Sequence, residues 1–168
     1  GMIGIAKVLL QKGYTISGSD LNNSLELKKL RKNGARVYIG HKKDQIKGAN
    51  LVVVSSAIDK KNPEIIQSQA KGITIIPRAE MLGSIMKGYE SIAIAGSHGK
   101  TTTTSMIAKI FSQADLSPTY VVGGKVLSTD ENSNLGEGSY LIAEADESDG
   151  SFTHLQPDVA VLTNIDDD

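Results

Sequence analysis

The residues with the clearest chemical potential form the segment Ala95–Thr102, which reads Ala-Gly-Ser-His-Gly-Lys-Thr-Thr. Glycines allow backbone N–H groups to close around phosphate oxygens, a lysine supplies positive charge, and a threonine hydroxyl can ligate magnesium. The segment therefore predicts a nucleotide site. It has the form G-x-x-G-K-T, since Ile94 stands where the usual G-x-x-x-x-G-K-[ST] pattern has its first glycine. The alternative is an ordinary glycine turn with a threonine that caps a helix.

Acidic residues follow two predicted strands further along the chain. Residues 144–149 follow a strand over 140–143, and residues 163–168 follow a strand over 159–162. Ligands of open α/β sheets bind at the carboxyl ends of the strands, so these acids are expected to face the nucleotide loop. One or two of their carboxylates would suffice for a magnesium–nucleotide site, and the others would be solvated.

The charge distribution is uneven although the net charge is only −1. All 18 lysines and arginines lie in residues 1–125 with eight acids, which gives +10, whereas residues 126–168 carry 11 acids and no base. The acidic end is either a solvated surface or a place where carboxylates are collected for a divalent cation. The positive charge of residues 1–125 would suit a nucleic-acid partner. The chain has only two Phe, five Tyr and no Trp, however, so aromatic side chains on which bases could stack are scarce, and we expect no nucleic-acid partner.

Composition limits the remaining classes. The chain has 168 residues, of which 39% are hydrophobic and 22% charged, as in ordinary globular proteins. The absence of cysteine excludes disulfides, thiolate zinc sites and cysteine nucleophiles. No apolar run is long enough to span a membrane, so we expect no membrane insertion. The sequence does not indicate an oligomeric state.

Strands and helices alternate along the whole chain, which is typical of parallel α/β sheets. Helices are expected at residues 2–12, 24–33, 62–71, 79–86 and from about 100 to 114, the last with Met106, Ile107, Ile110, Phe111 and Ala114 on one apolar face. Strands are expected at residues 14–20, 37–39, 51–54, 73–76, 91–95, 120–122, 140–143 and 159–162. The β-branched run over 51–54 predicts a strand buried on both faces, and so does that over 73–76.

These elements predict an α/β fold with a Rossmann-like parallel sheet domain over 1–88, followed by part of a P-loop α/β ATPase domain over 89–168. A helix followed by a strand that ends in Asp20 is the second half of a dinucleotide-type unit. We therefore expect that the first strand, most of its glycine loop and the end of the second domain lie outside this sequence. Such a fragment is not expected to turn over by itself.

The loop Gly96–Thr103 resembles the nucleotide loop of the Mur ligase family, in which the shortened spacing is usual. Further segments that resemble the family, in the same order along the chain, are residues 17–20, 53–58, 78–81, 144–152 and 154–157. The stretch from Glu144 to Phe152 is similar to the members that add L-alanine. The resemblance covers essentially the whole chain.

This resemblance implies a cytoplasmic ATP-dependent amide ligase of peptidoglycan biosynthesis. It would use ATP and Mg²⁺ to join L-alanine to the lactyl carboxylate of UDP-N-acetylmuramate through an acyl phosphate. The alternatives are a related ligase that adds a recycled murein peptide to the same sugar nucleotide, and a non-catalytic nucleotide-binding module.

The resemblance also implies roles for individual residues. The residues expected to bind ATP are Gly96, Ser97, His98, Gly99, Lys100, Thr101, Thr102 and Asn164. Thr101 and Glu144 would ligate magnesium, and Lys100, His98 and Glu144 are the candidate catalytic residues. For His98, a place near the transferred phosphate and a purely structural role in the loop both remain open.

The first domain is expected to bind the UDP part of the substrate. Its candidate residues are Ser19, Asp20, His41, Ser55, Ser56, Ala57 and Arg78. His41 is otherwise a surface histidine, Arg78 is otherwise part of a surface salt bridge, and His154 is either a substrate contact or a turn residue.

Overall fold

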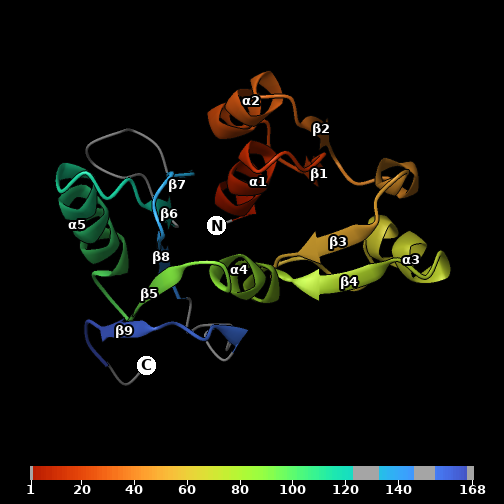
Figure 1. The fold of residues 1–168 in the computed structure, drawn as a ribbon. Coiled ribbons are helices and arrows are strands. Elements are labelled where there is room, and N and C mark those ends of the chain that lie inside the picture. Colours follow the sequence, from red (N-terminus) through yellow and green to blue (C-terminus); the bar gives the residue numbers. More distant parts are fainter. Residues whose placement is uncertain (1, 123–132, 146–153, 166–168) are drawn as a thin grey trace.

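The computed structural model describes residues 2–122, 133–145 and 154–165, and it has the expected α/β fold with mainly parallel strands (Figure 1). Several acidic residues singled out above lie outside the described residues: Asp146, Glu147, Asp149 and Asp166–Asp168. Gly150–Phe152 of the family-like stretch lie outside them as well.

The observed elements follow the predicted alternation. The first half contains α1 (Met2–Gln11), β1 (Ser17–Asp20), α2 (Leu25–Lys32), β2 (Arg36–Ile39), the 3₁₀ turn η1 (Lys43–Ile46), β3 (Leu51–Val54), α3 (Pro63–Ala70), β4 (Thr74–Pro77) and α4 (Arg78–Met86). The second half contains β5 (Glu90–Ala95), α5 (Lys100–Gln113), β6 (Thr119–Val121), β7 (Ser133–Asn134), β8 (Tyr140–Glu144) and β9 (Val159–Leu162). The strand expected over 14–20 begins only at Ser17, and β7 was not expected.

Two helices begin where the sequence places capping side chains. The Ser24 hydroxyl accepts a hydrogen bond from the backbone N–H of Leu27, with 3.2 Å between N and O, at the start of α2. The Asn62 side chain accepts from the N–H of Glu64 at 2.8 Å, and Pro63 occupies the first turn of α3. These side chains satisfy N–H groups that have no partner inside the helix, which fixes both helix starts.

The strands of the first half form two separate parallel pairs, β1 with β2 and β3 with β4. Leu51–Val54 and Thr74–Pro77 are therefore only half-buried or exposed. The prediction that both strands are buried on both faces is wrong for this structure, because each hydrogen-bonds to a single neighbour rather than lying inside a wide sheet.

The second half forms one five-stranded sheet in the order β7-β6-β8-β5-β9. All neighbouring strands in it are parallel except β6 and β7, which are antiparallel. Strand β5 lies between β8 and β9, so the segments that follow these three strands meet at the same edge of the sheet.

Helices cover both faces of this sheet (Figure 1). Ile5 and Val8 of α1 and Leu82 and Met86 of α4 pack on one face, in a cluster that includes Leu141 of β8. Each such buried side chain contributes about 1.5 to 3 kcal/mol of transfer free energy. Helix α1 also donates a hydrogen bond from Lys7 Nζ to the carbonyl of Ser133, at 2.9 Å. The core thus joins the two halves of the chain, and the division near residue 88 stays a prediction.

Helix α5 covers the other face, in a different orientation from the predicted one. Ile107 and Phe111 pack against the core, as expected, whereas Met106 and Ile110 are 60% and 59% exposed. The exposed Ala114 also departs from the predicted apolar face. The buried positions are filled by Thr104, Ser105 and Ala108, because small side chains let the helix approach the sheet closely.

In the part of the chain that the structure describes, none of the helices has the length and apolar character needed to cross a membrane.

Asp158 fastens the start of β9 to the start of β5. Its Oδ2 accepts hydrogen bonds from the Ser91 N–H at 2.7 Å and from the Ser91 hydroxyl at 2.9 Å. These bonds hold the pKa of the Asp158 carboxyl below its ordinary value of 3.8, because they stabilise the charged form.

We expect this contact to make the free energy of unfolding depend on acid pH. A carboxyl group whose pKa is lower in the folded state stabilises the fold above its unfolded pKa, and the stabilisation is lost as pH falls through the folded pKa. Urea unfolding measured between about pH 7 and pH 2 should therefore show a smaller loss for Asp158→Asn than for the unmodified chain. Asp44→Asn on the exposed η1 turn is the control, and equal pH profiles for the two variants would contradict the assignment.

Candidate active site

The loop between β5 and α5 has the backbone shape of a phosphate-binding loop. Gly96 and Gly99 have φ values of +130° and +83°, which residues with a Cβ rarely adopt. Gly99 caps α5, so the first N–H groups of that helix face the loop. A helix N-terminus preceded by such glycines is an anion-binding arrangement. The structure therefore favours the nucleotide loop over the alternative of an ordinary glycine turn.

The segment after β9 lies directly against this loop. A Cβ added to Gly96 would stand 2.1 Å from the Thr163 hydroxyl and 3.0 Å from the Asn164 carbonyl oxygen. Gly96 is itself buried. Two independent features therefore require glycine at position 96: its positive φ and the close approach of Thr163–Asn164.

Thr163 and Asn164 hold the loop through hydrogen bonds. The Asn164 Oδ1 accepts from the His98 N–H at 2.9 Å, and the Thr163 hydroxyl donates to the His98 carbonyl at 2.6 Å. The backbone N–H of Thr163 also donates to the Ala95 carbonyl at 3.0 Å. Asn164 was predicted to lie near the nucleotide, and its side chain accepts a hydrogen bond from the loop that is predicted to bind one. Thr163 belongs to the strand-end segment that was expected to face the loop, but it was not named as a site residue.

Lys100 folds its ammonium group into the loop. Its Nζ donates to the carbonyl of Gly96 and, at 3.4 Å, to that of Ser97. Lys100 and Thr101 are half-buried, whereas His98 and Thr102 are exposed. The loop therefore holds its positive charge at its centre, where a polyphosphate would lie.

Glu144 reaches the same edge of the sheet from β8. It lies opposite Ile94 in the β5–β8 register, and the next N–H, that of Ala145, donates to the Ile94 carbonyl at 2.8 Å. A carboxylate there and the Thr101 hydroxyl at the start of α5 are hard oxygen donors, which fit Mg²⁺. Within residues 2–122, 133–145 and 154–165, no group of three or more His, Asp or Glu side chains could hold a metal ion alone.

Two of the predicted UDP-binding residues meet a third residue that was not predicted. Ser19 at the end of β1, His41 after β2 and Glu64 in the first turn of α3 contact one another. The distances are 2.9 Å from Ser19 Oγ to His41 Nδ1, 2.6 Å from Ser19 Oγ to Glu64 Oε2, and 2.9 Å from His41 Nδ1 to Glu64 Oε2. The neighbouring Asp20 instead accepts from the N–H of Asn22 at 2.8 Å, within its own turn.

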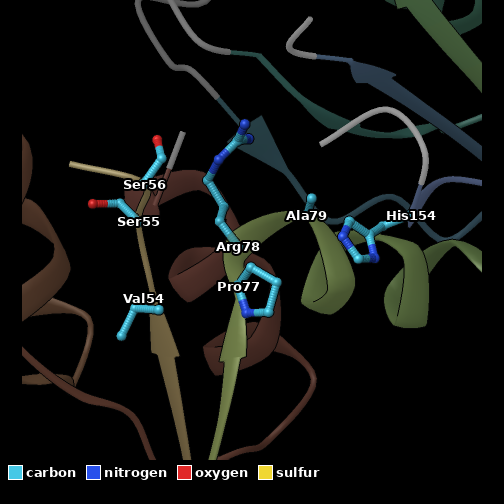
Figure 2. A pocket seen from close by; sticks show the side chains of 7 residues that line it. All are labelled: Val54, Ser55, Ser56, Pro77, Arg78, Ala79 and His154. Carbon is cyan, nitrogen blue, oxygen red and sulfur yellow. The ribbon is translucent and has the colours of Figure 1, made fainter. Parts of the chain in front are cut away.

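Other predicted residues line a pocket of about 150 Å³ (Figure 2). Ser55 and Ser56 come from the end of β3 and Arg78 from the start of α4, with His154 beside Ala79 (Figure 2). His154 is brought there because Gly83 of α4 allows its backbone to approach. A Cβ at Gly83 would lie 2.6 Å from the His154 carbonyl oxygen. Ala57 lines neither this pocket nor the Ser19 cluster among the residues described.

Comparison with known proteins agrees with this arrangement. Residues 1–90 match the catalytic domain of the Mur ligase family, and residues 94–168 match the Mur ligase middle domain. The chain belongs to the Mur ligase family. Over all of its 168 residues it is 52% identical to the UDP-N-acetylmuramate–L-alanine ligase of Laribacter hongkongensis, and it spans 36% of the length of that relative.

Solved structures of Mur ligases have the same fold. UDP-N-acetylmuramate-alanine ligase from Thermotoga maritima matches with a TM-score of 0.90 and 29% identity, over 100% of this chain and 41% of that one. The UDP-N-acetylmuramate:L-alanyl-gamma-D-glutamyl-meso-diaminopimelate ligase from Neisseria meningitides matches with a TM-score of 0.91 and 25% identity, over 99% of this chain and 58% of that one.

Glu64, in the Ser19 cluster, and Thr163, at the nucleotide loop, were not named as site residues by sequence reasoning. Glu64 follows Asn62 and Pro63, so it reads as an ordinary acidic residue in the first turn of a helix. Only the packing of α3 beside η1, and of η1 beside β1, shows that its carboxylate reaches Ser19 and His41.

Gly96→Ala tests the close approach of Thr163–Asn164 to the loop. We expect the free energy of unfolding to fall by about 2 kcal/mol or more, because the new Cβ meets the Thr163 hydroxyl and a positive φ disfavours alanine. Nucleotide binding, measured by calorimetry, should be lost with it. Gly88→Ala, where a Cβ meets nothing within 4 Å, is the control. Equal stability of the two variants in urea unfolding would refute the close approach.

Proposed function

We propose that this chain forms the UDP-substrate and ATP-binding parts of a cytoplasmic ligase that joins L-alanine to the lactyl carboxylate of UDP-N-acetylmuramate. The observation that carries the proposal is the loop Gly96–Thr101, held between β8 and β9 and beside Glu144. It is supported by 52% identity to a ligase with this substrate pair in its name. Because the chain spans 36% of that relative, the full reaction is proposed for an enzyme that includes this chain.

The proposed reaction has two steps. A carboxylate oxygen of the sugar nucleotide attacks the γ-phosphorus of ATP, the bond from that phosphorus to ADP breaks, and an acyl phosphate forms. The amine of L-alanine then attacks the acyl carbon, phosphate leaves, and the nitrogen loses a proton. Such transfers depend on alignment and on neutralising phosphate charge more than on a covalent nucleophile.

Several groups of this chain suit that task. The Lys100 ammonium would neutralise charge on the β- and γ-phosphates, and the N–H groups at the start of α5 would donate to phosphate oxygens. In the structure, Lys100 instead contacts the Gly96 and Ser97 carbonyls. Phosphate oxygens would compete with these carbonyls for the same ammonium group.

Thr101 and Glu144 would hold Mg²⁺ in this scheme. When bound, the ion would neutralise phosphate charge and help to align the transferred group. The Thr163 and Asn164 contacts would keep the loop open to the ligand by fixing its backbone at His98.

The UDP part of the substrate would lie along the carboxyl ends of the strands of the first half. Arg78 and the hydroxyl groups of Ser55 and Ser56 line one pocket and could donate hydrogen bonds to phosphate oxygens. Ser19 and His41 lie at the ends of the β1–β2 pair and would contact another part of the same ligand.

A coupled assay of phosphate release tests the proposal on the complete enzyme. Release should require UDP-N-acetylmuramate and L-alanine together, and a murein tripeptide should not replace L-alanine. Lys100→Ala should lower kcat/KM for ATP by about 100-fold or more, because the transferred phosphoryl group loses its nearest positive charge. Lys109→Ala, at an exposed position of the same helix, is the control. Preference for the tripeptide, or equal activity of both variants, would sink the proposal.

Glu144→Gln tests the magnesium assignment separately. The change removes a charged ligand and keeps the shape, so the Mg²⁺ concentration for half-maximal activity should rise by about tenfold or more. The affinity for ATP should change less. Glu137→Gln, in the exposed turn before β8, should leave the magnesium titration unchanged. The assignment would be wrong if the two glutamine variants gave the same titration curve.

A further inference from the structure

The cluster of Ser19, His41 and Glu64 has a geometry that differs from a hydrolytic triad. In such a triad the serine and the carboxylate contact opposite nitrogens of the imidazole. Here Ser19 Oγ and Glu64 Oε2 both lie 2.9 Å from the same nitrogen, Nδ1 of His41. The cluster is therefore not arranged to activate the serine as a nucleophile.

The contacts determine where the imidazole carries its proton. A carboxylate only accepts hydrogen bonds, so its contact with Nδ1 requires a proton on Nδ1. The Ser19 hydroxyl donates its proton to Glu64 Oε2, with 2.6 Å between the two oxygens. The Ser19 oxygen can therefore also accept a hydrogen bond from the Nδ1–H of His41. In the neutral imidazole, Nε2 consequently has a lone pair and acts as an acceptor.

The surroundings leave Nε2 for a ligand. The His41 and Glu64 side chains are each 15% exposed, and within the described part of the chain the hydrogen bonds of His41 are all made through Nδ1 and none through Nε2. The cluster lies just beyond the carboxyl ends of the paired strands β1 and β2, which is where open α/β sheets bind ligands.

The chemistry of this acceptor distinguishes the nucleoside from the diphosphate within the UDP part of the substrate. Phosphate oxygens carry negative charge and accept hydrogen bonds, so neither the Nε2 lone pair nor the neighbouring Glu64 carboxylate favours them. The donors of a uridine diphosphate are the imide N–H of uracil and the hydroxyls of ribose. An acceptor held by a carboxylate therefore fits the nucleoside, whereas the pocket of Arg78 fits the diphosphate.

We propose that Glu64 is a positioning residue that fixes the tautomer of His41, so that Nε2 accepts a hydrogen bond from the nucleoside part of the sugar nucleotide. This rests on the proposed function, since it assumes a uridine substrate. Ser19 completes the arrangement by bonding to both partners.

Steady-state kinetics of the complete enzyme test the role of Glu64. Glu64→Ala should raise KM for UDP-N-acetylmuramate by about tenfold, the effect of losing one well-placed hydrogen bond, with KM for ATP and kcat within about twofold. Glu64→Gln keeps an oxygen that accepts from Nδ1–H and should recover most of the affinity. Glu26→Ala is the matched control, because Glu26 holds the same first-turn position in α2 that Glu64 holds in α3.

Ligand analogues show which donor His41 meets. Inhibition by UDP is compared with inhibition by N3-methyl-UDP, 2′-deoxy-UDP and 3′-deoxy-UDP, in the unmodified enzyme and in His41→Ala. The analogue that lacks the relevant donor should bind about tenfold more weakly to the unmodified enzyme and suffer no further loss in His41→Ala. Additive losses for all three analogues would overturn the proposal.

The tautomer itself is measured by nitrogen-15 NMR of the unmodified protein at neutral pH. We expect a protonated Nδ1 and an unprotonated Nε2 on His41, and the reverse tautomer would overturn the inference without any variant. Failure of the proposed function is a different result. In that case the unmodified enzyme would show no turnover with UDP-N-acetylmuramate. If the enzyme is active but Glu64→Ala and Glu26→Ala have equal KM values for UDP-N-acetylmuramate, only the role of Glu64 is refuted.

Discussion

The position of β5 between two parallel neighbours is the constraint on which the nucleotide site depends. Because β8 and β9 run parallel to β5, the segments after all three strands leave the sheet at one edge. The loop after β5 therefore meets Glu144 from one side and Thr163–Asn164 from the other. Gly96 makes this possible, since a side chain there would collide with Thr163. The order of the strands in the sheet therefore brings the residues of this site together.

Packing on both faces of the sheet holds that order in place. Helices α1 and α4, from the first half of the chain, cover one face, and α5 covers the other (Figure 1). Gly4 of α1 lies so close to β6 and β7 that a Cβ would stand 3.1 Å from the Val121 side chain. The half that carries the UDP-site candidates thus supplies part of the core beneath the ATP-site candidates. Gly83 of α4 likewise lets the backbone of His154 come close, so residues from the first and second halves of the chain line one pocket (Figure 2).

The first half shows how polar groups from separate elements are combined. Its two strand pairs are not hydrogen-bonded to each other, but α3, which follows β3, reaches the end of the β1–β2 pair through Glu64. Glu64 thereby changes the chemical character of His41 from an ambiguous histidine to a directed acceptor. A separate pocket with Arg78 has the opposite character, since it donates and carries positive charge. In the proposed substrate complex, the first place suits the nucleoside and the second suits the diphosphate.

The sequence by itself determined the α/β class, nearly every helix and strand, the helix caps at Ser24 and Asn62, and the loop from Gly96 to Thr101. These features depend on local patterns: hydrophobic period, capping side chains and glycine spacing. Local patterns cannot show which strands become neighbours, so the strand order of the five-stranded sheet and the rotation of α5, with Met106 exposed, were decided by tertiary packing. The same holds for Thr163 and Glu64. Each acts on residues more than 20 positions away, and only the fold determines which distant hydrogen-bonding partners meet.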